Sequence, residues 1–376
     1  MTLVAILFWL SAGLIVYTHL GYPLALRLLL ALRRRPTLEP GVWEEPPRVS
    51  LIVAAYDEEE VIAAKVANAL ALDYPRERLE LIVASDGSAD ATVERARSAG
   101  ADVVLDLPRA GKLAAQNAAA EKAGGEILAF SDANSAWSAD ALLHLVEPFA
   151  DPAVGYACGQ VRFLDPEGGN LEGSYWRYEM KVREMESGLG GVTAGNGAIS
   201  AVRADDYIPL APSGSHDLSL PFALAKRGRR SLYVPWANAE EKMAPTLEGE
   251  FARKRRMMSH TWPIVFRGGL LSPRGYPPLY ALMIFSHRIL RYAAPFLHVA
   301  ALGLNIALLG HGWVYTAALA AQVALLAGAL LAGSVRQRLL LVARYYVLTN
   351  ASIALGLVDW LRHGTPAGWS PAEGTR

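Results

Sequence analysis

Residues 49–60 read "VSLIVAAYDEEE", a run of branched apolar residues that ends in a series of acidic side chains. Three further apolar runs follow, and each likewise ends in polar residues: "LELIVASD" (79–86), "ADVVLDL" (101–107) and "EILAFSD" (126–132). Amphipathic stretches typical of helices separate these runs, around 59–72, 89–99 and 111–123. Apolar strands that alternate with helices are typical of a parallel sheet covered on both faces. We therefore predict an α/β fold with a mostly parallel sheet.

Polar residues gather at the predicted carboxyl ends of these strands, as "YDEEE", "SDGSAD", "LPRAGK" and "SDANS". Each segment alone has a structural explanation, because acidic residues favour the first turn of a helix and Asp-Gly favours a turn. Ligands of open parallel sheets bind beyond the carboxyl ends of the strands. Four polar exits on one edge of a sheet therefore indicate a ligand site.

The composition excludes one class of protein and indicates another. Lys plus Arg and Asp plus Glu both number 36 in 376 residues, which argues against a nucleic-acid-binding protein. The charges are unevenly spread, since residues 1–31 carry one and residues 293–333 carry none, which is typical of membrane segments. The single cysteine, Cys158, excludes an intramolecular disulfide, suits a reduced compartment and is expected to be a small buried side chain.

Residues 1–35 are expected to form an N-terminal transmembrane anchor, because the apolar run is too long for a secretory signal and no basic stretch precedes it. The basic "RRR" at 33–35 places the following domain in the cytoplasm by the positive-inside rule, in an inner membrane. Residues 293–333 read as a transmembrane hairpin with a turn at His311-Gly312.

The remaining segments complete the predicted organisation. Residues 36–48 are a Pro- and Glu-rich linker, and residues 49–270 are the soluble domain. Residues 271–292 read as an amphipathic helix at the membrane surface, whose cations reach the lipid headgroups: His287, Arg288 and Arg291. Residues 334–376 hold a third apolar segment, which crosses, re-enters or rests in the interface, and a tail.

An ordered series of motifs runs along residues 49–291: "AAYDEEE", "YPRERLELIVASDGSADAT", "GKLAAQNAA", "FSDANS", "GNGAISAVR", "HDLSLPFALAKRG", "FARKRRM" and "FSHRILRYAAPF". This series resembles the family 2 glycosyltransferases, which are inverting enzymes of the GT-A fold. It is most similar to their membrane-anchored bacterial members, which synthesise polysaccharides and glycolipids. The resemblance implies a nucleotide-sugar-binding GT-A domain at residues 49–270.

The resemblance also implies a donor site. Asp86 would accept a hydrogen bond from the nucleotide base, and Asp57 and Glu59 would hold the ribose or the base. Lys112 and Arg253 would meet the negative charge of the diphosphate.

A divalent cation, Mg²⁺ or Mn²⁺, would stabilise the charge that the departing diphosphate gains. Asp132 resembles the first acid of the Asp-x-Asp motif of the family. Asn134 stands where the second acid often stands, so we expect a weaker metal site that depends on the donor phosphates.

Asp217 matches the acid that serves as general base in the family, although any acidic residue is favoured in the first turn of a helix. His216 stands where a second acid is more usual. Gly195, Asn196 and Gly197 resemble the loop that lines the acceptor side.

The stretch "FARKRRM" resembles the Gln-x-x-Arg-Trp motif of the family. Arg256 keeps the cation of that motif and is expected to offset charge on the leaving group. Met257 stands at the Trp position, which argues against a long processive sugar channel, and Trp262 is an alternative stacking side chain. The same cations would also suit a patch that attracts anionic lipid.

The leading function is therefore a hexosyl- or N-acetylhexosaminyl-transferase that moves a sugar from a nucleotide donor, expected to be UDP-linked, to a lipid-linked or glycolipid acceptor. A processive polysaccharide synthase is the second hypothesis, and it would need oligomers or an export partner to form a channel. A catalytically inactive nucleotide-sugar-binding protein is the third, because Asn134, His216 and Met257 depart from the family pattern.

Overall fold

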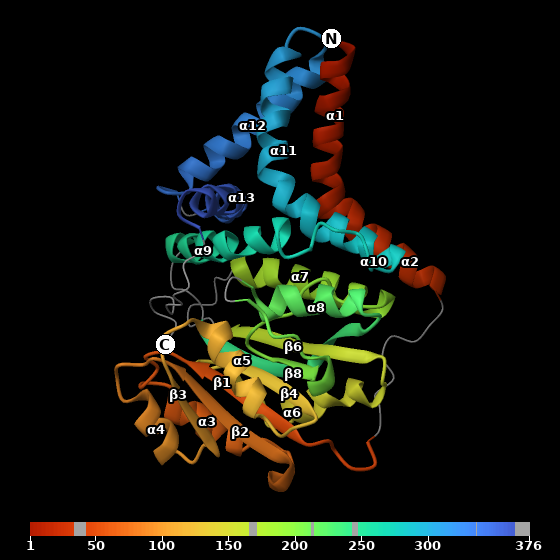
Figure 1. Cartoon of the computed structure of the whole chain (residues 1–376). Coiled ribbons are helices and arrows are strands. Elements are labelled where there is room, and N and C mark those ends of the chain that lie inside the picture. The colour runs from red at the N-terminus through yellow and green to blue at the C-terminus, as the bar shows by residue number, and fades with distance from the viewer. Residues whose placement is uncertain (34–42, 165–170, 212–213, 243–246, 336, 365–376) are drawn as a thin grey trace.

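The structure is a computed structural model that describes residues 1–33, 43–164, 171–211, 214–242, 247–335 and 337–364. Most of the predicted linker at 36–48, and the tail beyond residue 364, lie outside the described residues. Figure 1 shows a sheet domain below a layer of helices, with a narrow column of helices above it.

The first half of the sheet confirms the predicted alternation of strands and helices. Its parallel strands are β1 (Val49–Ala55), β2 (Leu79–Asp86), β3 (Val103–Leu107) and β4 (Ile127–Asp132). The helices between them are α3 (Ile62–Leu70), α4 (Thr92–Ser98) and α5 (Lys112–Lys122). Along β1, Leu51 and Val53 enter one hydrophobic core and Ile52 enters the core on the other face, as the two-residue period of a strand requires.

The second half of the sheet is mixed. The order is β3-β2-β1-β4-β7-β6-β8-β5, where β7 (Ser200–Arg203) runs antiparallel to both β4 and β6 (Val154–Leu164). Strand β8 (Arg230–Lys242) is parallel to β6 and antiparallel to the short β5 (Ala136–Trp137). Helices α6 (Ala141–Val146), α7 (Leu171–Leu189) and α8 (His216–Lys226) belong to this half. The described part of the domain also contains short 3₁₀ turns at Arg76–Arg78, Glu147–Ala150 and Ala204–Asp206.

The remaining helices form the layer and the column above the sheet domain (Figure 1). At the N-terminus, α1 (Thr2–Val16) continues through a π-helical turn, Tyr17–Gly21, into α2 (Tyr22–Arg33). Near the C-terminus, α10 (Pro278–Met283) continues through a second π-helical turn, Ile284–Ile289, into α11 (Leu290–Ala307). Helices α9 (Leu247–Phe266), α12 (Trp313–Leu331) and α13 (Arg338–His363) complete this part.

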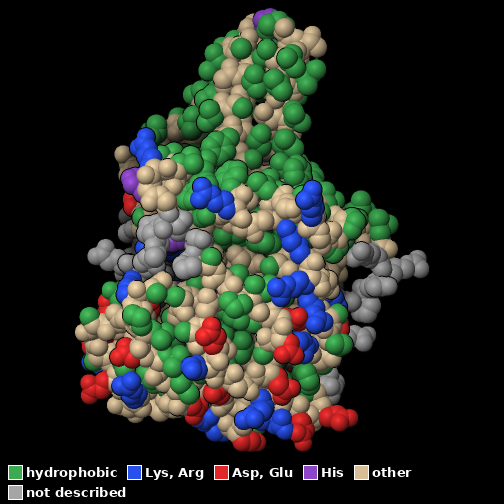
Figure 2. Space-filling view, viewed as in Figure 1, with side chains coloured by type: hydrophobic (Ala, Val, Ile, Leu, Met, Phe, Trp, Pro, Cys, Tyr) green, Lys and Arg blue, Asp and Glu red, His purple; other side chains and the backbone are tan. Residues whose placement is uncertain are grey.

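Among the residues that the structure describes, four helical segments are long and apolar enough to cross a membrane: Thr2–Leu32, Pro278–Ala307, Trp313–Leu331 and Arg338–His363. Apolar side chains cover the column of α1, α11 and α12 in Figure 2, whereas charged side chains spread over the sheet domain. This separation suits a membrane protein, because a lipid-facing surface lacks charges.

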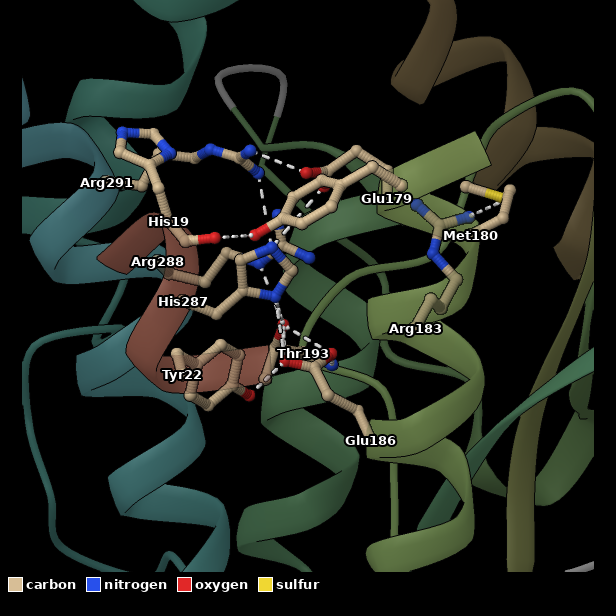
Figure 3. Close-up of polar contacts among 11 residues, drawn as sticks. His19, Tyr22, Glu179, Met180, Arg183, Glu186, Thr193, His287, Arg288 and Arg291 are labelled. Atoms are coloured by element: carbon tan, nitrogen blue, oxygen red, sulfur yellow. Dashed lines mark hydrogen bonds and ion pairs between the residues drawn. The ribbon is translucent and has the colours of Figure 1, made fainter. Parts of the chain in front are cut away.

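The prediction that His287, Arg288 and Arg291 reach lipid headgroups is wrong. His287 and Arg288 are buried, and Arg291 Nη2 lies 2.5 Å from Glu179 Oε1 of α7. These cations point into the protein because α7 supplies buried carboxylates opposite them (Figure 3). An amphipathic pattern alone does not show whether the polar face of a helix meets water, headgroups or protein.

Candidate active site

Asp86 holds the loop that leads into α5. It lies at the end of β2 and is almost fully buried. Its Oδ1 accepts hydrogen bonds from the backbone N–H groups of Ala110 at 2.7 Å and Gly111 at 2.8 Å, and its Oδ2 lies 3.3 Å from the Arg109 guanidinium. The predicted contact between Asp86 and a nucleotide base would therefore use the remaining lone pairs of a carboxylate that already shapes the site.

Asp57 and Glu59 join the loop after β1 to the loop after β2. Asp57 Oδ1 accepts from the Ala89 N–H at 2.8 Å, and Glu59 Oε2 accepts from the Ala91 N–H at 3.2 Å. Asp57 has a φ of 48°, a value that is uncommon for a residue other than glycine. Both carboxylates thus support these loops, and their predicted contacts with ribose or base remain predictions.

Lys112 and Asp132 form an ion pair at the carboxyl ends of the parallel strands. Lys112 is the first residue of α5, and Asp132 is the last residue of β4. Burial alone would lower the pKa of Lys112, but the charge and hydrogen bond of Asp132, together with the charges of Asp217 and Glu241, raise that pKa above its ordinary value. The ammonium therefore stays charged, as a ligand for a diphosphate must be.

Asp217 belongs to the same cluster. It lies in the first turn of α8, and the Ser215 hydroxyl donates a hydrogen bond to its Oδ1. Burial raises the pKa of Asp217, while the nearby charge of Lys112 opposes that shift. A carboxylate whose pKa is moved towards neutrality is better suited to accept a proton than an exposed aspartate.

Glu241 and Lys65 also belong to the cluster, and the sequence analysis missed both. The Oε1 atom of Glu241 is buried and has no hydrogen-bond partner among the described residues. Burial, and then the charge of Asp132, raise the pKa of Glu241. Lys65 is buried, donates to the Ser135 carbonyl at 2.7 Å and has a pKa lowered to about 7 by its burial.

Weak sequence signals for these two residues did exist. Lys65 lies on the apolar stripe of α3, between Ile62 and Val66. Glu241 continues the inward-facing alternation of Ala237 and Ala239 along β8. In each case a charged side chain occupies a position that the period assigns to the core.

The residues present fit a divalent cation held mainly by its substrate. No group of three or more His, Cys, Asp or Glu side chains that could hold a metal occurs among the described residues. Mg²⁺ typically takes one or two carboxylates and completes its shell with substrate phosphates and water. Asp132, together with the unpartnered oxygen of Glu241, provides such a pair. Asn134 lies in the turn after β4, and its predicted role as a ligand remains a prediction.

The loop of residues 190–199 connects α7 to β7, and we call it the glycine loop. Its residues have different roles. A Cβ at Gly197 would lie 3.6 Å from Lys112 Nζ and 3.7 Å from Asp132 Oδ2, so this glycine borders the charged cluster. A Cβ at Gly195 would instead overlap the Tyr156 hydroxyl. Asn196 is buried and donates to the Gly159 carbonyl at 2.7 Å. Only Gly197 therefore has the open position that was expected of an acceptor-side residue.

His216 is a buried neutral side chain. Its Nε2 lies 3.1 Å from the Tyr207 hydroxyl, and its ring packs edge-on against Phe130. Burial, aided by the charge of Lys112, lowers its pKa to about 3. We therefore expect His216 to pack beneath the site as a structural side chain rather than to exchange protons.

The basic stretch of α9 divides into paired cations and one that is exposed. Arg253 donates two hydrogen bonds of 2.7 Å to Glu250, Lys254 Nζ lies 3.3 Å from Glu250, and Arg255 lies 2.6 Å from Asp359 of α13. Arg256 has no ion pair within the described part of the chain. Its exposed charge is therefore available to an anionic ligand, whereas Arg253 is the cation of this stretch whose charge acts on Glu241 of the cluster.

Trp262 does not face the site, so the prediction that it stacks on an acceptor sugar is wrong. It is buried, donates to the Ile353 carbonyl at 3.0 Å and stacks on Phe266 with ring centroids 5.5 Å apart. Its position on α9 directs it into the contact with α13. Met257, at the Trp position of the motif, is 47% exposed.

Comparison with known proteins identifies the class of this sheet domain. Residues 50–208 match the family described as Glycosyl transferase family 2, so the chain carries a domain of that family. A mannosyltransferase from Pyrobaculum calidifontis, solved in complex with GDP-Man and Mn²⁺, superposes with a TM-score of 0.71. That likeness covers 95% of this chain and 99% of the other at 24% identity, and it shows a shared fold of the GT-A type.

Relatives were also found by sequence. The glycosyltransferase AglE of Haloferax volcanii is 30% identical over 147 residues, which are 38% of this chain and 48% of AglE. The poly-beta-1,6-N-acetyl-D-glucosamine synthase of Staphylococcus aureus is 24% identical over 256 residues, which are 64% of this chain and 61% of that protein. The chain thus matches about half to three fifths of the length of these relatives.

Proposed function

We propose that this protein is an inverting glycosyltransferase that moves a sugar from a nucleotide-sugar donor to a lipid-linked or glycolipid acceptor at the cytoplasmic face of the inner membrane. The observation that carries the proposal is the cluster of Lys112, Asp132, Glu241 and Asp217. Lys112 and Asp132 lie at the carboxyl ends of the parallel strands, within the family 2 match at residues 50–208, and Asp217 of α8 and Glu241 of β8 join them from the part of the chain that follows it. In such a cluster a cation can bind a diphosphate, and carboxylates can bind a metal ion and accept a proton.

The donor is proposed to be a UDP-sugar. The product of the related poly-N-acetylglucosamine synthase supports an N-acetylhexosamine as the transferred sugar. The mannosyltransferase of similar fold was solved with GDP-Man and Mn²⁺, so a guanosine donor is an outcome that the experiment must be able to reveal. The same complex supports a divalent metal in this protein.

The reaction is a single displacement. The acceptor hydroxyl attacks the anomeric carbon from the face opposite the diphosphate, the carbon–oxygen bond to the diphosphate breaks, and configuration inverts. Asp217 takes the proton of the attacking hydroxyl, and Lys112 and Arg256 offset the charge that remains on the diphosphate. A divalent cation, held by Asp132 and Glu241, supplies Lewis-acid stabilisation of the same charge when it is bound.

The membrane arrangement supports a lipid-borne acceptor. The charged cluster lies in the sheet domain, and α9, with its exposed Arg256, lies between that domain and the apolar column (Figure 1). Arg255 and Lys254 join α9 to α13 through Asp359 and Tyr345. We propose that α13 rests at the interface beside α9, so that an acceptor held in the bilayer can reach the site.

A processive polysaccharide synthase is the second candidate, which the similarity to the poly-N-acetylglucosamine synthase supports. The exposed Met257 favours single addition instead, because this position lacks the aromatic ring that stacks on a growing chain. Product length distinguishes the two, since a processive enzyme gives polymers before most acceptor is consumed.

The test is to incubate the purified protein in lipid with a panel of UDP- and GDP-sugars, with and without Mg²⁺ or Mn²⁺, and to measure both donor consumption and lipid-linked product. We expect one donor to be consumed only with a metal and the Asp217→Asn variant to lose at least about 100-fold in rate. Donor binding without turnover by the unaltered protein would establish the inactive binding protein instead.

A further inference from the structure

We propose that two membrane-side helical segments position the catalytic centre, through a buried network that ends at Thr193. The network joins Tyr22 of α2 and His287 of the second π-helical turn to Glu186 of α7, and it joins Arg288 of that turn to Thr193 (Figure 3). Thr193 is thus a positioning residue for Asp217. This inference rests on the proposed function, because it concerns the placement of the proposed general base.

Glu186 is the centre of the network. It is fully buried, and its Oε1 lies 2.6 Å from the Tyr22 hydroxyl and 2.7 Å from His287 Nδ1. Its Oε2 accepts a hydrogen bond from the Thr193 backbone N–H at 3.1 Å. Three segments that are distant in the sequence therefore meet on one carboxylate.

The charge of Glu186 is retained despite its burial. Burial alone would raise the pKa of this carboxyl, but the adjacent His287 and Arg288 hold it below its ordinary value. Hydrogen bonds to a buried charged group are stronger than those between neutral groups and are costly to break. The contacts of Glu186 therefore hold its partners in fixed positions.

Thr193 receives contacts from both sides. Its Oγ1 lies 3.0 Å from Glu186 Oε2 and accepts a hydrogen bond from Arg288 Nε at 2.9 Å. The residue before it is held in a similar way, because the Tyr280 hydroxyl donates to the Val192 carbonyl at 2.9 Å. The start of the glycine loop is thus anchored on helices of the membrane part.

The same loop reaches the proposed catalytic groups within a few residues. The Gly195 N–H donates to the carbonyl oxygen of Asp217 at 2.6 Å. Gly197 borders Lys112 and Asp132, as described above. A shift of Thr193 would therefore move the backbone that holds the first turn of α8.

Both membrane-side segments have a π-helical turn where they join the network: Tyr22 directly follows one turn, and His287 and Arg288 lie within the other. Tyr17–Gly21 and Ile284–Ile289 interrupt otherwise α-helical segments, and the Tyr17 hydroxyl lies 2.9 Å from Ser286 Oγ. Single π turns inside α-helices are rare and frequently occur at functional sites. Two π turns that contact each other beside one buried network indicate a specific arrangement rather than general packing.

The test compares Thr193→Val with Thr193→Ser in the full-length protein in lipid. Valine keeps the shape but removes the hydroxyl that Glu186 and Arg288 contact, whereas serine keeps the hydroxyl. We expect Thr193→Val to reduce kcat by about 10- to 100-fold, because small misplacements of catalytic groups have effects of that size. The Kd for the donor nucleotide, measured by equilibrium binding, should change less than about twofold, and Thr193→Ser should retain most of kcat.

Glu184→Gln is the matched control, since Glu184 lies on the same helix but is exposed and, within the described residues, forms its ion pair with Lys181. It should leave kcat, donor binding and thermal unfolding unchanged. An unchanged kcat in Thr193→Val, or equal losses in Thr193→Val and Thr193→Ser, would overturn the inference. Failure of the proposed function is distinguishable, because the unaltered protein would then show no transfer from any donor.

Discussion

At the scale of single side chains, the candidate site holds more charge than its motifs suggest. The ion pair of Lys112 and Asp132 lies among further titratable groups that approach from α3, α8 and β8. Groups whose pKa values are moved in opposite directions by burial gather where a protein binds or transforms charge. Within this cluster Glu241 is the clearest candidate to bind a further group, because one of its buried oxygens has no hydrogen-bond partner among the described residues.

We predict that Glu241→Gln weakens metal dependence without unfolding the protein. The amide keeps the shape of the side chain but removes the charge that would attract a divalent cation. The half-saturating concentration of Mn²⁺ should rise by about 10- to 100-fold. The measurement is calorimetry of donor binding at increasing concentrations of Mn²⁺.

Glu240→Gln provides the matched control for that titration. Glu240 is the exposed neighbour on β8, so its loss changes the formal charge equally without changing the cluster. If both variants bind Mn²⁺ as the unaltered protein does, Glu241 is not a ligand, and Asp132 with Asn134 would be left as the metal site.

The protonation of Asp217 predicts the acidic side of the activity profile. The base must be unprotonated to act, so kcat falls as the pH falls through its pKa. Burial raises that pKa, so the fall should begin at a higher pH than the value of about 4 of an ordinary aspartate would give. The measurement is kcat from about pH 4 to pH 9, with the exposed Asp205→Asn as a control. An identical acidic limb in the residual activity of Asp217→Asn would show that another group titrates.

At the scale of elements, the glycine loop between α7 and β7 connects the core to the site. We predict opposite phenotypes for alanine at its two glycines. Gly195→Ala places a Cβ against Tyr156 and should destabilise the fold by about 1–3 kcal/mol, measured by thermal unfolding in detergent. Gly197→Ala makes only ordinary contacts, so it should leave unfolding unchanged but weaken donor binding.

A double variant checks the reason for the first effect. Adding Tyr156→Phe to Gly195→Ala removes the hydroxyl that the new methyl group would overlap, so part of the lost stability should return. Additive losses in the double variant would show that the cost at Gly195 has another origin.

Helix α9 offers a second contrast between neighbouring positions. Arg256→Ala should reduce kcat by about 100-fold or more, because no other cation of this helix lies free of a carboxylate or tyrosine partner in the described structure. Arg255→Ala removes a half-exposed pair with Asp359 and should change kcat less than about threefold. Similar losses of kcat in both variants would indicate that the basic stretch of α9 attracts anionic lipid instead.

The strands and helices of the first half of the sheet could be predicted because their periods are local properties of the sequence. Asp132, Lys112 and Asp217 could be predicted together from the ordered motifs, and they do meet in one cluster. Glu241 could not be placed beside Asp132, because that contact depends on the pairing of β5 with β8. The contact between Glu186 and His287 was missed for the same reason, since it joins α7 to a helix far along the chain.

At the scale of the whole molecule, the proposed topology puts the N-terminus and the turn between α11 and α12 on the side of the membrane opposite the sheet domain. Both lie at the far end of the column in Figure 1. The lone Cys158 is fully buried, so single new cysteines can be labelled against a silent background. This permits a direct test of orientation.

We predict that His311→Cys reacts with a membrane-impermeant maleimide in intact cells. Arg97→Cys on α4 should react only after permeabilisation, because α4 belongs to the sheet domain. Both positions are exposed, so access differs only by the side of the membrane. Labelling of both in intact cells would contradict the cytoplasmic placement, and labelling of neither would contradict the hairpin crossing.

The two π turns have a consequence for how this protein can change over evolution. In an α-helix each residue advances the side-chain direction by about 100°, so deleting one residue from Ile284–Ile289 would restore regular geometry and rotate α11 about its axis. Arg291 would then turn away from Glu179 towards lipid or a neighbouring helix. Insertions and deletions in these spans should therefore be eliminated by selection even where hydropathy is preserved, so a generic membrane anchor could not replace either span.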